Sequence, residues 1–551
     1  MVLLKSYRLK SERVIDNAFG MSQNKGLLLF CNYIYMENSG AFSNHTLLYT
    51  GIVCAYVLVM LCIGYWCMKR THNVGDFFLG NRSLGPWMSA FAYGTSYFSA
   101  VIFIGYAGKL GWGFGIQTLW IVVGNTLIGT VLAWLVLAKR TRVMTARLNA
   151  MTMPEFMAER YGSKPMKVLS GITIFCLLVP YSASVYMGLS YLFQKTMGLG
   201  YSDALIFLAL LTGVYLVMGG YFAVAVSDFI RGLVEFLGVM LMVYLLIHMK
   251  GGLATTFHQL CAPVNMPDLF TPDGALKSAA DSGGLFAGWL ILVSLVFITS
   301  FGPWALPQMV QKFYSMKDER DVLRIVFIAG TLSLILSFGA YYTGALTHLF
   351  FTTPEDLAPI MTETGKLNLD ILIPHFIVSY VPAWLVLLIL LLVFSASMSS
   401  LSSLVLVSSS AIAIDIYGTF STLEQKKKEK RTMLYMRLLC ALFVLVSLLL
   451  ALVKINFIVN LMVIAWGALG GAFLAPYVYG LFWKRTTKAG AYAGMISGLG
   501  ISIVLFIKWG SPGIPVAGAI SMIVPMIVVP VVSLMTPAPD QKLIDKAFGE
   551  K

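Results

Sequence analysis

The sequence predicts an all-α protein that crosses a membrane many times. Of its 551 residues, 58% are hydrophobic and only 12% are charged, and the mean hydropathy is +0.80. Apolar runs of about 20 residues, enough for a helix to cross a bilayer core of about 30 Å, recur along the whole chain. Lys and Arg gather in alternate connections between these runs. Together these observations predict a polytopic membrane protein without a second soluble domain.

About thirteen runs qualify as transmembrane helices. In chain order they lie near 45–68, 86–108, 112–138, 167–196, 202–225, 229–249, 284–311, 325–351, 382–417, 433–453, 455–482, 489–507 and 513–535. We expect residues 45–535 to form one membrane domain, followed by a short tail at 536–551.

The net charge of +14 indicates membrane topology rather than nucleic-acid binding. Basic residues crowd four connections, at 139–167, 312–324, 426–431 and 484–488. Since basic loops stay on the cytoplasmic side, we expect the first span to begin outside, the number of spans to be odd, and the tail to be cytoplasmic. Lys312 falls in the second basic loop in this interpretation.

Residues 1–44 do not fit that topology, because they carry five basic residues on the side that should hold few: Lys5, Arg8, Lys10, Arg13 and Lys25. The apolar run 27–35 is too short to span and lacks a small-residue cleavage site. We hypothesise that this extension is either disordered or a start-site artefact, with synthesis beginning at Met36. N-terminal sequencing of the native protein tests this, and a mature chain that begins at Met1 contradicts it.

Hydroxyl side chains lie deep inside the run 382–417. Ala396, Ser399, Ser400 and Ser403 follow the spacing i, i+3, i+4, i+7 and therefore share one helix face. At that depth, small oxygen-bearing side chains either pack helices together or bind a small charged ligand.

Two spans carry residues that interrupt a helix. Gly94 precedes several polar-capable residues in the run 86–108, and the run 284–311 contains Pro303 and Pro307. An opened helix frees backbone carbonyls that can replace the water shell of a hard cation. If the first span is peripheral, these are the opening helices of two successive five-helix units, although no internal sequence repeat is visible.

The same chain gives no sign of catalysis. Its seven cysteines and six histidines are scattered, without a CxxC pair, an HExxH motif, a Walker loop or a GxSxG motif. We therefore expect neither an enzyme nor an organic cofactor.

Several segments in order resemble the sodium:solute symporter family, particularly its sodium/pantothenate and sodium/proline symporters. The similarity covers about residues 49–506, and its carrying segments are 76–85 (DFFLGNRSLG), 152–156 (TMPEF), 219–228, 396–410, 415–417 (DIY) and 480–491 (GLFWKRTTKAGA). The resemblance implies the leucine-transporter-type fold, a five-plus-five inverted repeat with peripheral helices, here with core repeats at about 86–249 and 284–482.

The resemblance also implies ion sites. The family's main sodium site corresponds here to the carbonyl oxygens of Thr95, Phe98 and Ala396 and the hydroxyls of Ser399 and Ser400. A second site found in some relatives corresponds to Asp228, Ser402 and Ser403, together with Ser399. The alternative for Asp228 is a capping role at the following helix, and the alternative for the serines is helix packing. Na⁺ is the only metal ion that we expect.

For the solute, the family geometry places six residues at the central pocket: Ser99, Ala100, Tyr181, Thr299, Ser300 and Trp304. Each of them singly is also consistent with packing. Sugar-transporting members carry an amide where this chain has Ile102. Proline-transporting members carry Trp and Tyr at the positions matched by Thr299 and Pro303, and no Arg or Lys is evident in the pocket. We expect a compact polar solute: an organic acid, a vitamin acid or an amino acid.

The predicted function is import of this solute by alternating access, driven by the inward Na⁺ gradient across a bacterial plasma membrane. The partners are the solute, Na⁺ and the lipid bilayer, without nucleic acid, and the oligomeric state is open. The alternative is a passive channel or a solute-binding membrane sensor on the same fold.

Overall fold

The computed structural model describes residues 44–68, 78–262, 265, 285–362, 365, 367–422, 424–454 and 458–549. Its contacts divide the chain into Met1–Ile52 and Val53–Lys551. The second unit holds all the residues of functional interest. Residues 1–43 of the predicted extension lie outside the described residues. Within the described ranges the secondary structure is helical, apart from two isolated β-bridges.

The α-helices follow one another along the whole chain. Their bounds are α3 (Asn44–Met68), α5 (Pro86–Tyr97), α6 (Ala107–Phe114), α7 (Leu119–Gly124), α8 (Lys139–Arg147), α9 (Met153–Tyr161), α10 (Lys164–Met197), α11 (Tyr201–Met249), α12 (Leu253–Leu260), α13 (Gly288–Phe301), α14 (Pro307–Ser315), α15 (Val322–Phe350), α16 (Pro354–Leu357), α17 (Leu372–Tyr380), α18 (Ala383–Ser410), α19 (Gly418–Phe420), α20 (Gln425–Val453), α21 (Ile458–Phe482), α22 (Lys488–Met535) and α23 (Gln541–Phe548).

Short 3₁₀ and π segments extend or interrupt these helices. The π segments are η2 (Val101–Tyr106), η4 (Asn125–Leu132), η5 (Trp134–Ala138) and η9 (Ala411–Tyr417), and the 3₁₀ segments are η1 (Gly80–Arg82), η3 (Gly115–Thr118), η6 (Gly302–Trp304), η7 (Glu319–Asp321) and η8 (Ala358–Ile360). Such segments often occur at functional sites. Two of them, η2 and η6, adjoin the breaks described below.

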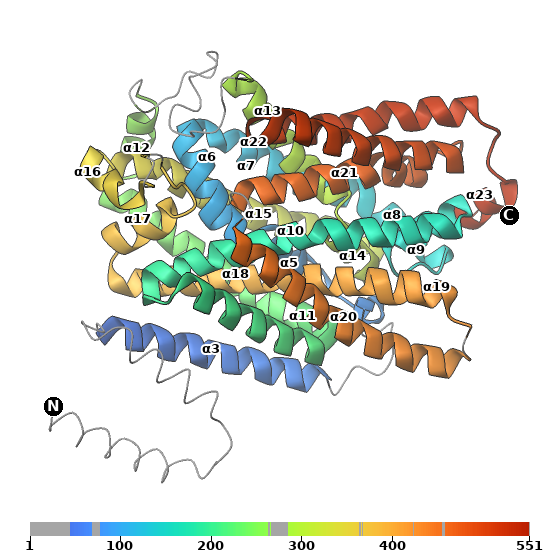
Figure 1. Ribbon diagram of the computed structural model, residues 1–551, viewed down its shortest axis with the longest axis horizontal. Coiled ribbons are helices and arrows are strands. Elements are labelled where there is room, and N and C mark those ends of the chain that lie inside the picture. The colour runs from blue at the N-terminus through green and yellow to red at the C-terminus, as the bar shows by residue number, and fades with distance from the viewer. Residues whose placement is uncertain are drawn as a thin grey trace, which may run out of the picture. The chain divides into compact units, whose positions relative to one another are not determined.

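Two long helices form the interior of the bundle (Figure 1). Of the residues in an 18-residue apolar stretch, 83% are buried in α18 and 94% in α21, whereas 33% are buried in α20. α18 packs against α5, α10, α11 and α20, and α21 packs against α10 and α22. The serine side chains of α18, from Ser395 to Ser410, are all buried within the protein.

Ten helical stretches in the described residues are long and apolar enough to cross a membrane, so the count of about thirteen stays a prediction. Some of the stretches hold two predicted spans. Gly115 (φ 53°) turns the chain after α6, a few residues beyond the predicted boundary. Gly510 (φ 59°, ψ −159°) divides α22 between the last two predicted spans, in a conformation that only glycine adopts readily.

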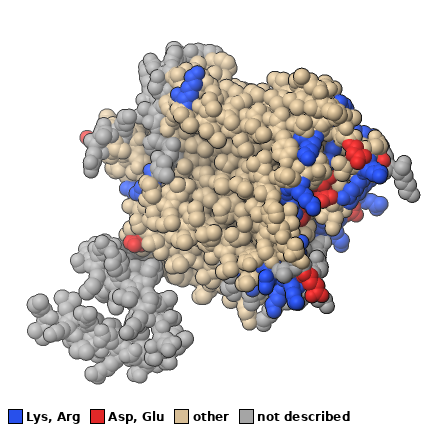
Figure 2. All heavy atoms as spheres, turned by 45° about the vertical axis from the view of Figure 1, so that its right-hand side comes forward, with Lys and Arg blue, Asp and Glu red and all other residues tan. Residues whose placement is uncertain are grey.

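Most charged side chains on the visible face gather at one end of the second unit, a few lie at the opposite end, and a broad uncharged band separates them (Figure 2). The ends of α8, α19 and α23 lie together at the right-hand end of Figure 1. The first predicted basic loop is mostly helical, because α8 and α9 occupy it. This distribution agrees with a membrane-embedded band, and the orientation of the termini stays a prediction.

The crossing of α6 with α15 has no room for a side chain at Gly344. A Cβ atom there would collide with the backbone carbonyl of Ala107. We expect Gly344→Ala to lower the free energy of unfolding by about 1–3 kcal/mol through overpacking, measured by thermal unfolding in detergent. A Cβ atom at Gly213 on α11 would meet no other atom within 4 Å, so Gly213→Ala should be neutral or slightly stabilising. Equal effects of the two variants would contradict this packing.

Candidate functional site

The first broken helix lies where the sequence predicted it. α5 begins with Pro86 at its first turn and ends at Tyr97, because Phe98 has an extended backbone (φ −103°, ψ 121°). Helical structure resumes at Ala100 and continues into η2. The Ser99 hydroxyl accepts a hydrogen bond from the Val101 N–H at 3.2 Å and so caps the new start. The Phe98 N–H still donates to the Gly94 carbonyl at 3.2 Å, so the hydrogen-bond ladder of α5 is interrupted directly after Phe98.

The second broken helix matches the other predicted interruption. α13 ends at Phe301, η6 follows, and α14 starts again with Pro307. The Leu306 backbone is extended (φ −69°, ψ 122°). The two interruptions therefore occur in the two helices predicted to open the repeats.

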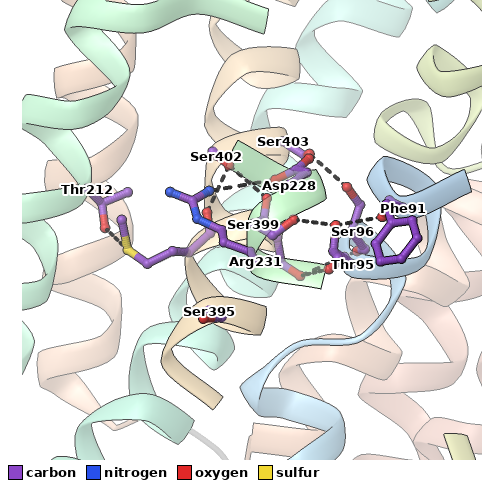
Figure 3. A network of polar contacts seen from close by, with 12 residues as sticks. Phe91, Thr95, Ser96, Thr212, Asp228, Arg231, Ser395, Ser399, Ser402 and Ser403 are labelled. Atoms are coloured by element: carbon purple, nitrogen blue, oxygen red, sulfur yellow. Dashed lines mark hydrogen bonds and ion pairs between the residues drawn. The ribbon is translucent and has the colours of Figure 1, made fainter. Parts of the chain in front are cut away.

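The hydroxyl face of α18 meets the first break (Figure 3). Ser399 Oγ donates to Thr95 Oγ1 at 2.8 Å. Ser400 Oγ lies 3.4 Å from the carbonyl oxygens of Thr95 and Ser96, a long contact compared with the usual distance of about 2.8 Å. These two carbonyls are therefore only weakly engaged. Ala396, one turn earlier on the same face, is fully buried.

The residues predicted for a second ion are brought together only in part. Ser403 Oγ lies 3.0 Å from Ser96 Oγ. Ser402 Oγ instead donates to carbonyls of its own helix, those of Met398 (2.8 Å) and Ser399 (2.9 Å). Asp228 is fully buried on α11, where it lies mid-helix and does not serve as an N-cap.

Lys312 corrects the sequence interpretation. The residue was assigned to a basic loop, but it lies on α14 and is fully buried. Its Nζ donates to Ser403 Oγ at 3.1 Å and lies 3.8 Å from Asp228 Oδ2. A signal was present in the sequence: Gln308, Gln311, Lys312 and Ser315 have the spacing i, i+3, i+4, i+7, as do the residues of the α18 face.

Two further charges on α11 were missed. Arg231 Nη1 lies 3.6 Å from Asp228 Oδ1, and both side chains have no exposed surface. Glu235, one turn farther along, is also fully buried. Ionisable side chains inside a membrane span are costly and usually functional. Asp228, Arg231 and Glu235 share one side of α11 by spacing.

The predicted solute-binding residues fall into two groups, those whose polar side chains make hydrogen bonds within the protein and those whose polar side chains do not. Thr299 Oγ1 donates to the Leu295 carbonyl at 2.9 Å, and Trp304 Nε1 donates to the Ile128 carbonyl at 2.9 Å. By contrast, Ser300 Oγ and Tyr181 OH are buried without a hydrogen-bond partner among the described residues. Ala100 packs closely against Gly188. Ser300 and Tyr181 therefore remain the better candidates for solute contact.

Aromatic residues that sequence reasoning missed extend this group. Trp466 lies edge-on to Tyr181, with 5.8 Å between ring centroids, and 6.0 Å from Tyr97 beside the break. Trp466 Nε1, Tyr106 OH, Tyr341 OH and the Asn125 amide are also buried without partners in the described part of the chain. We call Tyr106, Asn125, Tyr181, Ser300, Tyr341 and Trp466 the orphan polar cluster. Asn125, an amide in the middle of an apolar run, was its visible sequence signal.

A family model described as "Sodium:solute symporter family" matches residues 77–498. The chain belongs to this family. Family members are transporters, so the protein is not an enzyme, and the family supports Na⁺ as the coupling ion for solute import.

Individual relatives agree over nearly the whole chain. The osmoregulated proline transporter OpuE of Bacillus subtilis is 29% identical over 511 residues, 90% of this chain and 96% of its own. A sodium/proline symporter of Staphylococcus aureus is 28% identical over 469 residues, 84% of this chain and 86% of its own. Among solved structures, a Na⁺-coupled sialic acid symporter in a substrate-bound outward-open state has a TM-score of 0.72 at 19% identity, covering 91% of this chain and 99% of its own. The predicted leucine-transporter-type fold is confirmed.

The buried Asp228 makes a direct stability prediction. Asp228→Asn leaves the Lys312 and Arg231 charges without their shared carboxylate, which should cost about 3–5 kcal/mol of unfolding free energy. Asp321 and Arg324 form a surface pair at 3.4 Å, with the Arg324 side chain 77% exposed. Asp321→Asn should therefore cost less than about 1 kcal/mol. Thermal unfolding of both variants in detergent checks this contrast, and a harmless Asp228→Asn would show that Asp228 is not ionised between the two cations.

Proposed function

We propose that the protein imports a compact polar solute and that its coupling Na⁺ binds between the break in α5 and the hydroxyl face of α18. The ligands are the carbonyl oxygens of Thr95, Phe98 and Ala396 and the hydroxyls of Ser399 and Ser400. The observation that carries this proposal is the extended backbone at Phe98, directly beside buried hydroxyls. Neutral oxygens suit a hard cation that must later be released.

The weak contacts of Ser400 support the same site. Its hydroxyl lies 3.4 Å from two carbonyls, so an ion that enters replaces poor hydrogen bonds rather than good ones. Binding also connects α5 with α18. An ion that binds this arrangement better than any other shifts the population toward it, and this population shift provides the coupling needed for alternating access.

For the solute, we infer an amino acid or another small carboxylic acid. The named relatives transport proline, and the orphan polar cluster offers both donors and acceptors in an aromatic enclosure. Thr299 and Pro303 replace the Trp and Tyr typical of proline-transporting members, which favours an acid other than proline. The positive end of the dipole of the helix that starts at Ala100 favours a carboxylate.

The sodium assignment predicts the effect of one double variant. Ser399→Ala together with Ser400→Ala removes two of the five oxygen ligands and should abolish Na⁺-dependent thermal stabilisation at concentrations that saturate the unaltered protein. Thermal unfolding in detergent with NaCl or choline chloride measures this. Ser397, whose hydroxyl bonds within its own helix to the Val393 carbonyl at 2.6 Å, provides the control: Ser397→Ala should keep the Na⁺ response. A double variant that responds normally would place the ion elsewhere.

The solute assignment predicts a second pattern. A panel of amino acids and small organic and vitamin acids, screened by thermal unfolding with and without Na⁺, should contain a compound that stabilises the protein only when Na⁺ is present. For that compound, Tyr181→Phe should raise Kd roughly tenfold, because a buried hydrogen bond to the solute is lost. Tyr477→Phe removes a hydroxyl that lies 2.6 Å from Thr141 Oγ1, outside the orphan polar cluster, and should leave Kd unchanged. An unaltered Kd in Tyr181→Phe would exclude Tyr181 from the site.

A further inference from the structure

The ammonium group of Lys312 lies at the position where the family resemblance implied a second sodium ion. Its Nζ contacts Ser403 Oγ (3.1 Å) and Asp228 Oδ2 (3.8 Å), two of the residues predicted to bind that ion. Asp228 and Lys312 have no exposed side-chain surface. The position therefore already holds a positive charge, supplied by the chain itself.

The contacts of this ammonium connect three helices. Lys312 belongs to α14, directly after the second break, and Ser403 belongs to α18. Ser403 Oγ also lies 3.0 Å from Ser96 Oγ on α5, next to the first break. A cation at this point thus joins both broken helices to the central helix, as a bound metal ion would.

The carboxylate of Asp228 is already paired with two cations without a metal ion. Arg231 Nη1 lies 3.6 Å from its Oδ1 and Lys312 Nζ lies 3.8 Å from its Oδ2, and all three side chains are fully buried. An additional Na⁺ at Asp228 would leave a net positive charge in surroundings of low dielectric constant, close to another cation. The position accommodates the ammonium or the metal ion, but not both.

We propose that Lys312 is a permanent, tethered substitute for a second Na⁺, and that this transporter therefore binds one Na⁺ per cycle. The proposal rests on the proposed function, because the single ion is the one between α5 and α18. In this proposal Lys312, which stays in place throughout the cycle, occupies the second sodium site suggested by Asp228, Ser402 and Ser403.

Counting bound ²²Na⁺ on the purified protein tests this without knowledge of the solute. We expect a saturating count of one per chain for the unaltered protein and of two for Lys312→Ala, in which Asp228 lacks the ammonium and space is free. Lys312→Ala combined with Asp228→Asn should return the count to one. Lys317→Ala, which removes an exposed lysine five residues farther along, should also bind one. Two ions on the unaltered protein, or only one on folded Lys312→Ala, would overturn the proposal.

A further pair of variants separates this inference from the proposed function. Ser399→Ala with Ser400→Ala should reduce the count to zero. Ser400→Ala with Lys312→Ala keeps Ser399, which also belongs to the second site, and should bind one ion there. If the serine variants keep their ion, the proposed main site is wrong, whatever Lys312 does. If Lys312→Ala fails to fold, Lys312→Gln is used instead. Na⁺, but not K⁺, should then bind at the position that the ammonium has left and raise the thermal stability of the variant. The count on the unaltered protein decides the stoichiometry in either case.

Discussion

The structure depends on the satisfaction of polar groups where the membrane provides no water. Opening α5 at Phe98 releases backbone groups that would each be costly in hydrocarbon. The hydroxyl face of α18 lies against this opening, with Ser399 bonded to Thr95 at 2.8 Å and Ser400 at 3.4 Å from two carbonyls. The contact is tight enough to hold the helices together and loose enough to admit an ion. Burial of the serine residues of α18 follows from this requirement, since a lipid-facing serine face would have no such partners.

The orphan polar cluster has the opposite character. Its hydroxyl, indole and amide groups are buried and lack a partner at good hydrogen-bond geometry among the described residues. Tyr181 lies near Ser99 and Trp466, and Tyr341 lies near Asn125. The hydroxyls of Ser399, Ser402 and Ser403, by contrast, all make hydrogen bonds. Unsatisfied polar groups in a low-dielectric interior are costly to the protein alone. A solute that hydrogen-bonds to them recovers that cost, so the same cluster that is unfavourable in isolation favours binding. Tyr97, which stacks on Phe98 and approaches Trp466, links this cluster to the proposed ion site.

Sequence reasoning found the features that are local and missed those that depend on tertiary packing. The breaks at Phe98 and Leu306 follow from glycine and proline chemistry, and the serine face of α18 follows from helical spacing, so both were predictable. Lys312 was misplaced because a lysine near the end of an apolar run normally indicates a cytoplasmic loop. The carboxylate of Asp228, from a helix more than eighty residues earlier, makes burial of that ammonium tolerable. Glu235 and Arg231 were missed for the same reason.

The identity of the buried cation sets what the transporter can accomplish. A mobile Na⁺ that crosses with the membrane potential brings about 2.3 kcal/mol per 100 mV, plus about 1.4 kcal/mol for a tenfold gradient. One ion therefore supports accumulation of a neutral solute by roughly 500-fold, and two ions by the square of that ratio. A tethered ammonium adds nothing to this driving force, since it returns with the protein in each cycle. It does keep α5, α14 and α18 joined when the concentration of Na⁺ is low. With Lys312 in place of a second ion, the transporter thus reaches a lower solute concentration ratio but moves more solute for each Na⁺ that enters.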